Sequence, residues 1–170
     1  VVETIETADW RREKIVYSVD GRDVPAYLYL PKGYRRPLQV IHFAPAGDVA
    51  SGLRTLPASI EGFLAPFIRG GRAIFSVVLE GYTERPRPPN FALPDSRADE
   101  YVDYVVTQVT ELRRGLDYLE TRKDLDTSRI AFVGPSAGSW AGVILTALET
   151  RFRSVLFIGT RISPSEVTDT

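Results

Sequence analysis

The sequence predicts one domain of the α/β class, with a mainly parallel sheet, an antiparallel hairpin near its amino end and helices on both faces. Apolar runs at residues 38–44 and 73–79 lack polar alternation, as expected of strands that are buried on both faces. Amphipathic stretches with helical spacing separate the apolar runs, and strands that alternate with helices favour a parallel sheet. A length of 170 residues suits one domain with a substantial core.

The amino-terminal part is predicted to form the hairpin. Residues 14–20 and 24–30 are rich in β-branched and aromatic side chains, and residues 21–23 join them through a glycine. Alternating polarity and a short link of this kind are typical of an antiparallel pair. Residues 30–34 contain proline and glycine, which end a strand.

The middle of the chain predicts one helix and one long loop. Residues 56–68 carry an apolar stripe at helical spacing, and the helix should end at Gly70 and Gly71, because glycine suits a helix C-cap. Residues 80–94 are rich in proline and arginine, and loops of this length in compact domains are usually functional.

Tyr82, Arg85 and Arg87 lie in that loop, at the edge of the sheet where open α/β sheets bind ligands. The two arginines are candidates to receive an acidic group of a substrate. The alternative is that they are solvated loop arginines with little energetic role.

The carboxyl-terminal half predicts two more helices and two more strands. Residues 95–122 are expected to form the longest helix, because their apolar residues recur at steps of three and four. Residues 124–129 are expected to form a turn and residues 130–133 a short strand. Residues 136–149 then predict a helix and residues 154–158 a strand that is apolar on both faces.

Composition excludes several classes of protein. The formal net charge is −1, which lacks the basic excess of a protein that binds nucleic acid or a membrane surface. No apolar run reaches the roughly 18 residues of a membrane span. Cysteine is absent and histidine occurs once, so we expect no metal site, and no phosphate-loop or dinucleotide motif indicates a cofactor.

The amino terminus carries no apolar signal segment, and we expect a cytoplasmic protein. The chain has no methionine, even at position 1. We therefore expect that Val1 is not the translated start.

One motif carries chemistry. Gly134-Pro135-Ser136-Ala137-Gly138 matches the pattern G-x-S-x-G, directly after a predicted strand and directly before a predicted helix. A serine at so sharp a turn takes a strained backbone, and its neighbours two positions away must be small, as Gly134 and Gly138 are. The sequence therefore predicts that Ser136 is a catalytic nucleophile. The alternative is a turn in which Ser136 merely caps the helix.

A nucleophilic serine needs two backbone donors for the oxyanion that forms on its substrate. Ala137 directly follows Ser136 and is expected to give the first. The second is expected from Gly47, or alternatively from Ala46, in the loop after the strand at 38–44. A plain turn after a buried strand would also favour glycine at position 47.

His42 is predicted not to be catalytic. It lies inside the apolar run 38–44 and before Ser136, whereas this arrangement orders its residues as serine, acid and then histidine. A packed, hydrogen-bonded core histidine is the expected role. The chain has no other histidine, so these residues cannot form a complete catalytic set of serine, histidine and acid.

Three segments resemble bacterial α/β-hydrolases of the esterase and acyl-peptidase-like type. They read YLYLPKGYRRPLQVIHFAPAG, LRRGLDYLETRKDLDTSRIAFVGPSAGSWAG and ALETRFRSVLFIG, and the likeness runs from about Trp10 to Gly159. The resemblance implies that Ser136 is the nucleophile and that Ala137 and the loop at 45–47 give the oxyanion amides. One departure is that the loop HFAPAG contains only one glycine.

The resemblance also implies that residues 1–170 are part of an α/β-hydrolase domain, truncated before the last strands, which would carry the acid and the histidine. The expected activity is hydrolysis of a small ester through an acyl-enzyme on Ser136. Alternatives are a non-catalytic module for binding or regulation, or a peptidase or acyltransferase on the same fold. The apolar strand at 154–158 would then be an exposed sheet edge, open to association or to a missing carboxyl-terminal segment.

Overall fold

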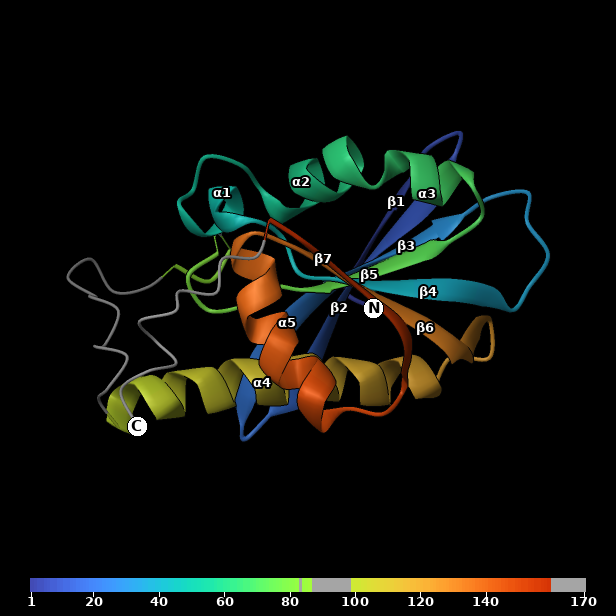
Figure 1. Ribbon diagram of the computed structural model, residues 1–170. Helices are drawn as coiled ribbons and strands as arrows, with labels where there is room; N and C mark the ends of the chain where they lie inside the picture. The colour runs from blue at the N-terminus through green and yellow to red at the C-terminus, as the bar shows by residue number, and fades with distance from the viewer. Residues whose placement is uncertain (83, 87–98, 160–170) are drawn as a thin grey trace.

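The computed structural model describes residues 1–82, 84–86 and 99–159, which form a seven-stranded sheet in the order β1-β2-β3-β5-β4-β6-β7 with helices on both faces (Figure 1). The strands are β1 (Glu3–Glu6), β2 (Trp10–Val19), β3 (Arg22–Pro31), β4 (Leu38–Phe43), β5 (Ala73–Val77), β6 (Leu125–Pro135) and β7 (Phe152–Ile158). The helices are α1 (Gly47–Ala50), α2 (Leu56–Phe63), α3 (Ala65–Arg69), α4 (Asp99–Glu120) and α5 (Ala137–Leu148).

The α/β class is confirmed, but the sheet is mixed rather than mainly parallel. Strands β1, β2, β3 and β5 pair antiparallel in that order. Strands β5, β4, β6 and β7 pair parallel. The hairpin therefore extends the parallel half as a second, antiparallel half of one continuous sheet, since β3 pairs with β5.

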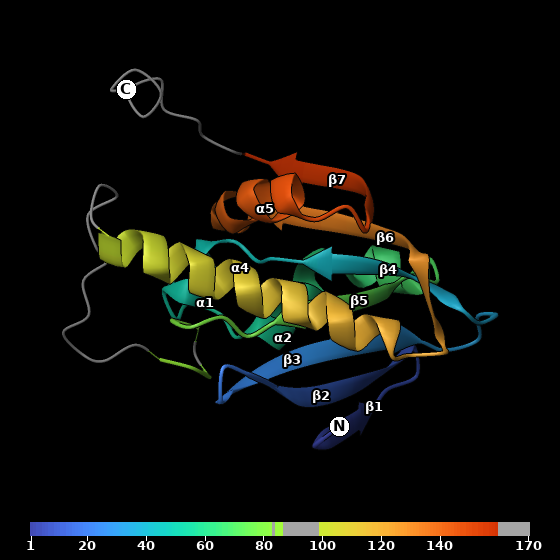
Figure 2. The ribbon, with the colours of Figure 1, turned by 90° about the horizontal axis from the view of Figure 1, so that it is seen from below.

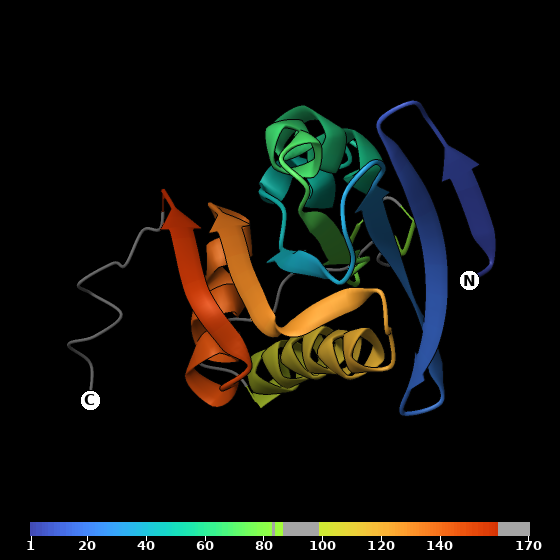
Figure 3. The same ribbon diagram turned by 90° about the vertical axis from the view of Figure 1, so that its right-hand side faces the viewer.

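The helices form two layers. Helices α1, α2 and α3 lie on one face, and α4 and α5 lie on the other (Figures 2 and 3). The longest helix, α4, crosses the sheet and contacts β2, β5 and β6, whereas α5 packs on β6 and β7. Both faces of the central strands are therefore covered, which explains their continuous apolar sequences.

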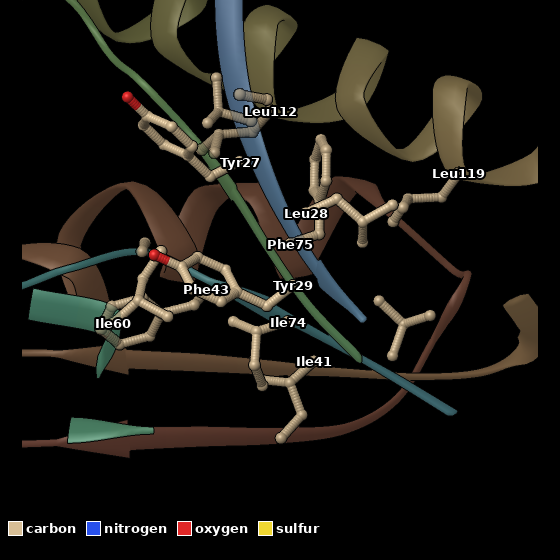
Figure 4. Close-up of a cluster of buried hydrophobic side chains, with 14 of the residues drawn as sticks. Tyr27, Leu28, Tyr29, Ile41, Phe43, Ile60, Ile74, Phe75, Leu112 and Leu119 are labelled. Atoms are coloured by element: carbon tan, nitrogen blue, oxygen red, sulfur yellow. The ribbon is translucent and has the colours of Figure 1, made fainter. Parts of the chain in front are cut away.

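Buried apolar side chains form a core on each face of the sheet, under each layer of helices (Figure 4). Leu28 and Phe75 are opposite each other on β3 and β5, and they are fully buried beside the α4 residues Leu112 and Leu119. The other face buries a second set, made of Tyr29, Ile41, Phe43, Ile60 and Ile74.

The predicted antiparallel hairpin is confirmed, but the residues predicted to connect its strands are wrong. Val19 pairs with Arg22, so the two-residue connection is Asp20-Gly21, not residues 21–23. Both connecting residues have positive φ, at 50° and 76°. An Asp-Gly pair suits such a turn because aspartate tolerates and glycine favours this conformation.

Two helix predictions need correction. The helix expected at 56–68 is two helices, because Pro66 lacks the backbone N–H that would continue α2 and instead lies in the first turn of α3. The short helix α1 stands where a loop was expected. Of the helix expected at 95–122, α4 covers Asp99–Glu120, and residues 95–98 lie outside the described residues.

The strands predicted at 14–20, 24–30, 130–133 and 154–158 were too short, whereas those predicted at 38–44 and 73–79 were slightly too long. The turn expected at 124–129 belongs to β6, whose register against β4 shifts between Gln39 and Val40. Leu125 and Asp126 pair with Leu38 and Gln39 through the backbone, which does not depend on apolar side chains, whereas residues 127–129 have no partner in the register with β4 or β7. Strand β1 was missed because its four residues are exposed and two of them, Glu3 and Glu6, are charged.

Strand β7 ends the sheet of described residues, and its apolar side chains are open to solvent on both faces. Val155 is 42% exposed on the α5 side, next to Phe132, while Leu156 and Ile158 are 48% and 39% exposed. The opposite edge strand, β1, carries Glu3 and Glu6 instead. Charged edges resist pairing with another chain, and apolar edges favour it.

Within the part of the chain that the structure describes, no helix is long and apolar enough to cross a membrane.

Candidate active site

Ser136 occupies the sharp turn between β6 and α5. Its φ is +49° and its ψ is −115°, and only Asp20 shares a positive φ among the described residues other than glycine. Such a backbone costs about 1–3 kcal/mol and persists only where surrounding contacts fix it. Here the Ser136 amide donates to the carbonyl of Ile158 at 2.7 Å, and the Ser139 hydroxyl donates to the carbonyl of Ser136 at 2.5 Å.

Both flanking glycines stand where a side chain would collide with backbone. A methyl group on Gly134 would lie 2.7 Å from the carbonyl oxygen of Gly138. A methyl group on Gly138 would lie 2.0 Å from the carbonyl oxygen of Ala44. The spacing of the motif thus lets the start of α5 press against β6 and against the end of β4.

The same contact brings the loop after β4 beside Ser136. A methyl group on Gly47 would lie 3.8 Å from Cβ of Ala137, so the two residues are neighbours. Gly47 begins α1 and Ala137 begins α5, and the first amides of a helix have no acceptor within it. Ala46 is the N-cap of α1, with an extended backbone. All the residues singled out in the two motifs therefore meet in one place.

A cavity of about 520 Å³ opens beside these residues. Ala46, Ala137 and Gly138 form one side of it. Its other walls come from the segment that follows β5, the first turns of α4 and the start of α5. The remaining lining residues are Ala44, Pro45, Ala50, Leu79, Glu80, Tyr82, Tyr101, Tyr104, Gln108, Trp140 and Ala141.

The aromatic part of this lining was not singled out from the sequence. Tyr101 and Tyr104 are among the apolar residues whose spacing predicts the longest helix, and Trp140 lies in the helix predicted at 136–149. Trp140 is 48% exposed although it lies on the helix that follows Ser136. A large aromatic residue four positions after a candidate nucleophile was the available signal.

Arg85 does not serve as a receptor for an acidic group in this structure. Its guanidinium binds the Glu111 carboxylate through two bonds of 2.7 and 2.9 Å, and it also donates to the carbonyl of Val78 at 2.8 Å. The Glu111 partner raises the pKa of Arg85 further. Tyr82, from the same predicted loop, does line the cavity. Arg87 lies outside the described residues.

His42 is a fully buried core residue on β4. Its ring packs against Phe75 and Phe132, with centroid distances of 5.4 and 5.9 Å, and against Phe152 at 6.0 Å. Among the described residues neither ring nitrogen has a hydrogen-bond partner, so the expected hydrogen bonding is not found. Burial lowers the pKa of His42 to about 4, and the nearby backbone of Leu112 opposes this only in part.

The lowered pKa makes stability depend on pH. The unfolded chain binds a proton on His42 near pH 6.5, whereas the folded chain binds it only near pH 4, so stability is lost as pH falls between these values. From pH 7 to pH 5 we expect a loss of about 2 kcal/mol in the free energy of unfolding. His42→Leu should abolish most of this slope, because the chain has no second histidine. Urea unfolding at pH 7, 6 and 5 measures both proteins, and equal slopes would contradict the assignment.

Comparison with known proteins rests on structure. No protein-family model matches this chain, and no curated protein matches it in sequence. Among solved structures, a cold-adapted esterase from an Arctic intertidal metagenomic library has a TM-score of 0.65 and 15% identity, over 92% of this chain and 64% of that one. An acetyl xylan esterase from Paenibacillus sp. R4 has a TM-score of 0.64 and 19% identity, over 90% and 51%. Oligopeptidase B from Leishmania major has a TM-score of 0.65 and 16% identity, over 88% and 20%.

These neighbours are esterases and a peptidase, and they define the fold of this chain as the α/β-hydrolase type. The likeness covers most of this chain, but this chain spans at most 64% of the length of the three neighbours described.

Proposed function

We propose that this chain provides the nucleophile and the oxyanion donors of a serine ester hydrolase. The Ser136 hydroxyl oxygen attacks the ester carbonyl carbon, and the alcohol leaves while the acyl group stays on Ser136. The amides of Ala137 and of Gly47 or Ala46 donate to the oxyanion, and water then releases the acid. The observation that carries this proposal is the strained Ser136 backbone, held directly beside the loop after β4.

The proton of Ser136 needs a base. His42 is the one histidine in the sequence, and its burial among phenylalanine rings makes it unsuitable. We therefore infer that a histidine base, with the acid that orients it, comes from polypeptide outside these 170 residues. The same acyl-enzyme serves peptidases and acyltransferases, but ester cleavage requires the least assistance to its leaving group.

A base supplied from solution tests this proposal. We expect the 170-residue chain to hydrolyse 4-nitrophenyl esters negligibly on its own, and added imidazole to raise turnover at least about tenfold above that of Ser136→Ala with the same imidazole. Ser128→Ala, a substitution at an exposed serine near the amino end of β6, whereas Ser136 follows its carboxyl end, is the matched control and should behave as the unchanged chain. Equal imidazole-dependent rates in the unchanged chain and Ser136→Ala would exclude Ser136 as the nucleophile.

The exposed β7 edge supports a second role, association through that edge. We expect the chain to form dimers or larger assemblies, because pairing would bury Val155, Leu156 and Ile158 and satisfy the outer backbone groups of β7. Leu156→Lys should shift the association equilibrium toward the monomer, as measured by sedimentation equilibrium. Leu53→Lys changes a residue that is 84% exposed elsewhere on the surface and should have no such effect. A monomer at all concentrations would contradict the association.

A further inference from the structure

We propose that the cavity beside Ser136 binds an uncharged aromatic group of the ester and discriminates against an anionic one. This inference rests on the proposed function, because it takes the cavity as the place where one side of the ester lies. The walls of the cavity, its size and its charge each contribute to the argument.

The walls offer aromatic rings at the distances that a further ring would adopt. Tyr101 and Trp140 meet edge to face, with centroids 5.5 Å apart and planes at 79°, and Tyr101 and Tyr104 are 6.5 Å apart. These rings come from two helices, α4 and α5. Aromatic rings prefer tilted or offset contacts at 4.5–7 Å, so a ring of the ligand extends an arrangement that already exists.

The size of the cavity exceeds the needs of an acetyl group. A cavity of about 150 Å³ suffices for benzene, and this one measures about 520 Å³. It therefore accommodates a ring together with the short linker that joins it to the carbonyl near Ser136. A small acyl group would leave most of the apolar wall in contact with water. Its binding would therefore lack the favourable free energy that comes from burying that surface.

The charge of the lining decides between neutral and anionic groups. Glu80 is the one charged side chain among the described lining residues. Arg85, the nearest arginine in sequence, has both of its terminal nitrogens engaged by Glu111. The Gln108 side-chain amide, a neutral donor, already donates to the Tyr104 hydroxyl. An anion in the cavity would meet a carboxylate and no described cation, and like charges at short range repel.

Binding of two matched probes tests the inference without any turnover. In Trp10→Phe, Trp140 is the sole tryptophan and its fluorescence reports on the cavity. We expect 3-phenylpropionamide to change this fluorescence saturably, 3-phenylpropionate to bind at least about tenfold more weakly at pH 8, and acetamide to have no effect. Glu80→Gln should reduce the difference in affinity between the amide and the carboxylate probe. Tyr101→Ala should weaken the binding of the amide, whereas Phe67→Ala, a substitution in α3 on the other face of the sheet, should leave that binding unchanged.

Three results would overturn the inference: equal or tighter binding of the carboxylate, an acetamide response equal to that of the phenyl probe, or an equal loss in Phe67→Ala and Tyr101→Ala. Circular dichroism establishes that each variant is folded. The same titration in Ser136→Ala separates this inference from the proposed function. Probe binding without Ser136-dependent turnover would contradict the proposed hydrolase activity and support the proposed binding in the cavity. Turnover without probe binding would support the activity and contradict the binding.

Discussion

Arg85→Met is expected to lower the free energy of unfolding by about 3–5 kcal/mol, because it leaves a buried carboxylate without its partner. The Glu111 side chain has no exposed surface, and Arg85 is its bidentate partner. The Arg85 backbone also closes a turn with Gly81 and Tyr82, through bonds of 2.8 Å, so the ion pair anchors the wall of the cavity to α4. Urea unfolding at pH 7 measures the loss.

Two further variants show whether the burial of the charge is responsible. Arg114→Met removes an ion pair on the same helix, with Asp117, whose two side chains are 61% and 44% exposed. Exposed pairs contribute about 0–1 kcal/mol, so this variant should be nearly neutral. Adding Glu111→Leu to Arg85→Met removes the orphaned charge and should recover most of the loss. A loss below about 1 kcal/mol in Arg85→Met would contradict the role given to this pair.

Gly138→Ala is expected to destabilise the protein by about 3 kcal/mol or more, since its methyl group cannot fit without moving backbone. The group would lie 2.0 Å from the oxygen and 2.6 Å from the carbon of the Ala44 carbonyl, and 2.7 Å from the oxygen of Pro45. Relief requires α5 to move away from the end of β4. That shift would also separate Ala137 from Gly47, so imidazole-dependent hydrolysis should fall along with the temperature of unfolding.

Gly62→Ala is the matched control for this substitution. Gly62 lies in α2, and the nearest atom to its added methyl group is on the flexible Arg54 side chain at 3.7 Å. Alanine favours a helix over glycine by up to about 1 kcal/mol, so this variant should be slightly more stable. If Gly138→Ala were as stable as Gly62→Ala, the close contact at Ala44 would not exist.

Much of the site could be predicted from the sequence because its constraints are local. The motif around Ser136 needs glycine at two fixed positions, and the distances at Gly134 and Gly138 give the steric reason. The burial of His42 also follows from its apolar neighbours along β4. Such features depend on spacing within one segment, which sequence patterns record directly.

Other features could not be predicted because they depend on partners far along the chain. The sequence leaves Arg85 either as a receptor for an acidic group or as a solvated loop residue, but Glu111, 26 positions away, binds it. Strand β1 and the first residues of β6 are held by backbone pairing, which leaves little trace in side-chain polarity. The break between α2 and α3 is different, since Pro66 was a visible signal that the apolar stripe outweighed.

The most direct test of the central claim is the site at which a fluorophosphonate modifies the chain. Such reagents form a stable bond to a nucleophilic serine, and added imidazole stands in for the histidine base that we propose lies outside these residues. The account predicts one adduct per chain, located by peptide mass on the fragment that contains Ser136 and absent from Ser136→Ala. Adducts spread over other serines, or retained in Ser136→Ala, would contradict the assignment of Ser136 as the nucleophile, as would a folded chain that takes up no label.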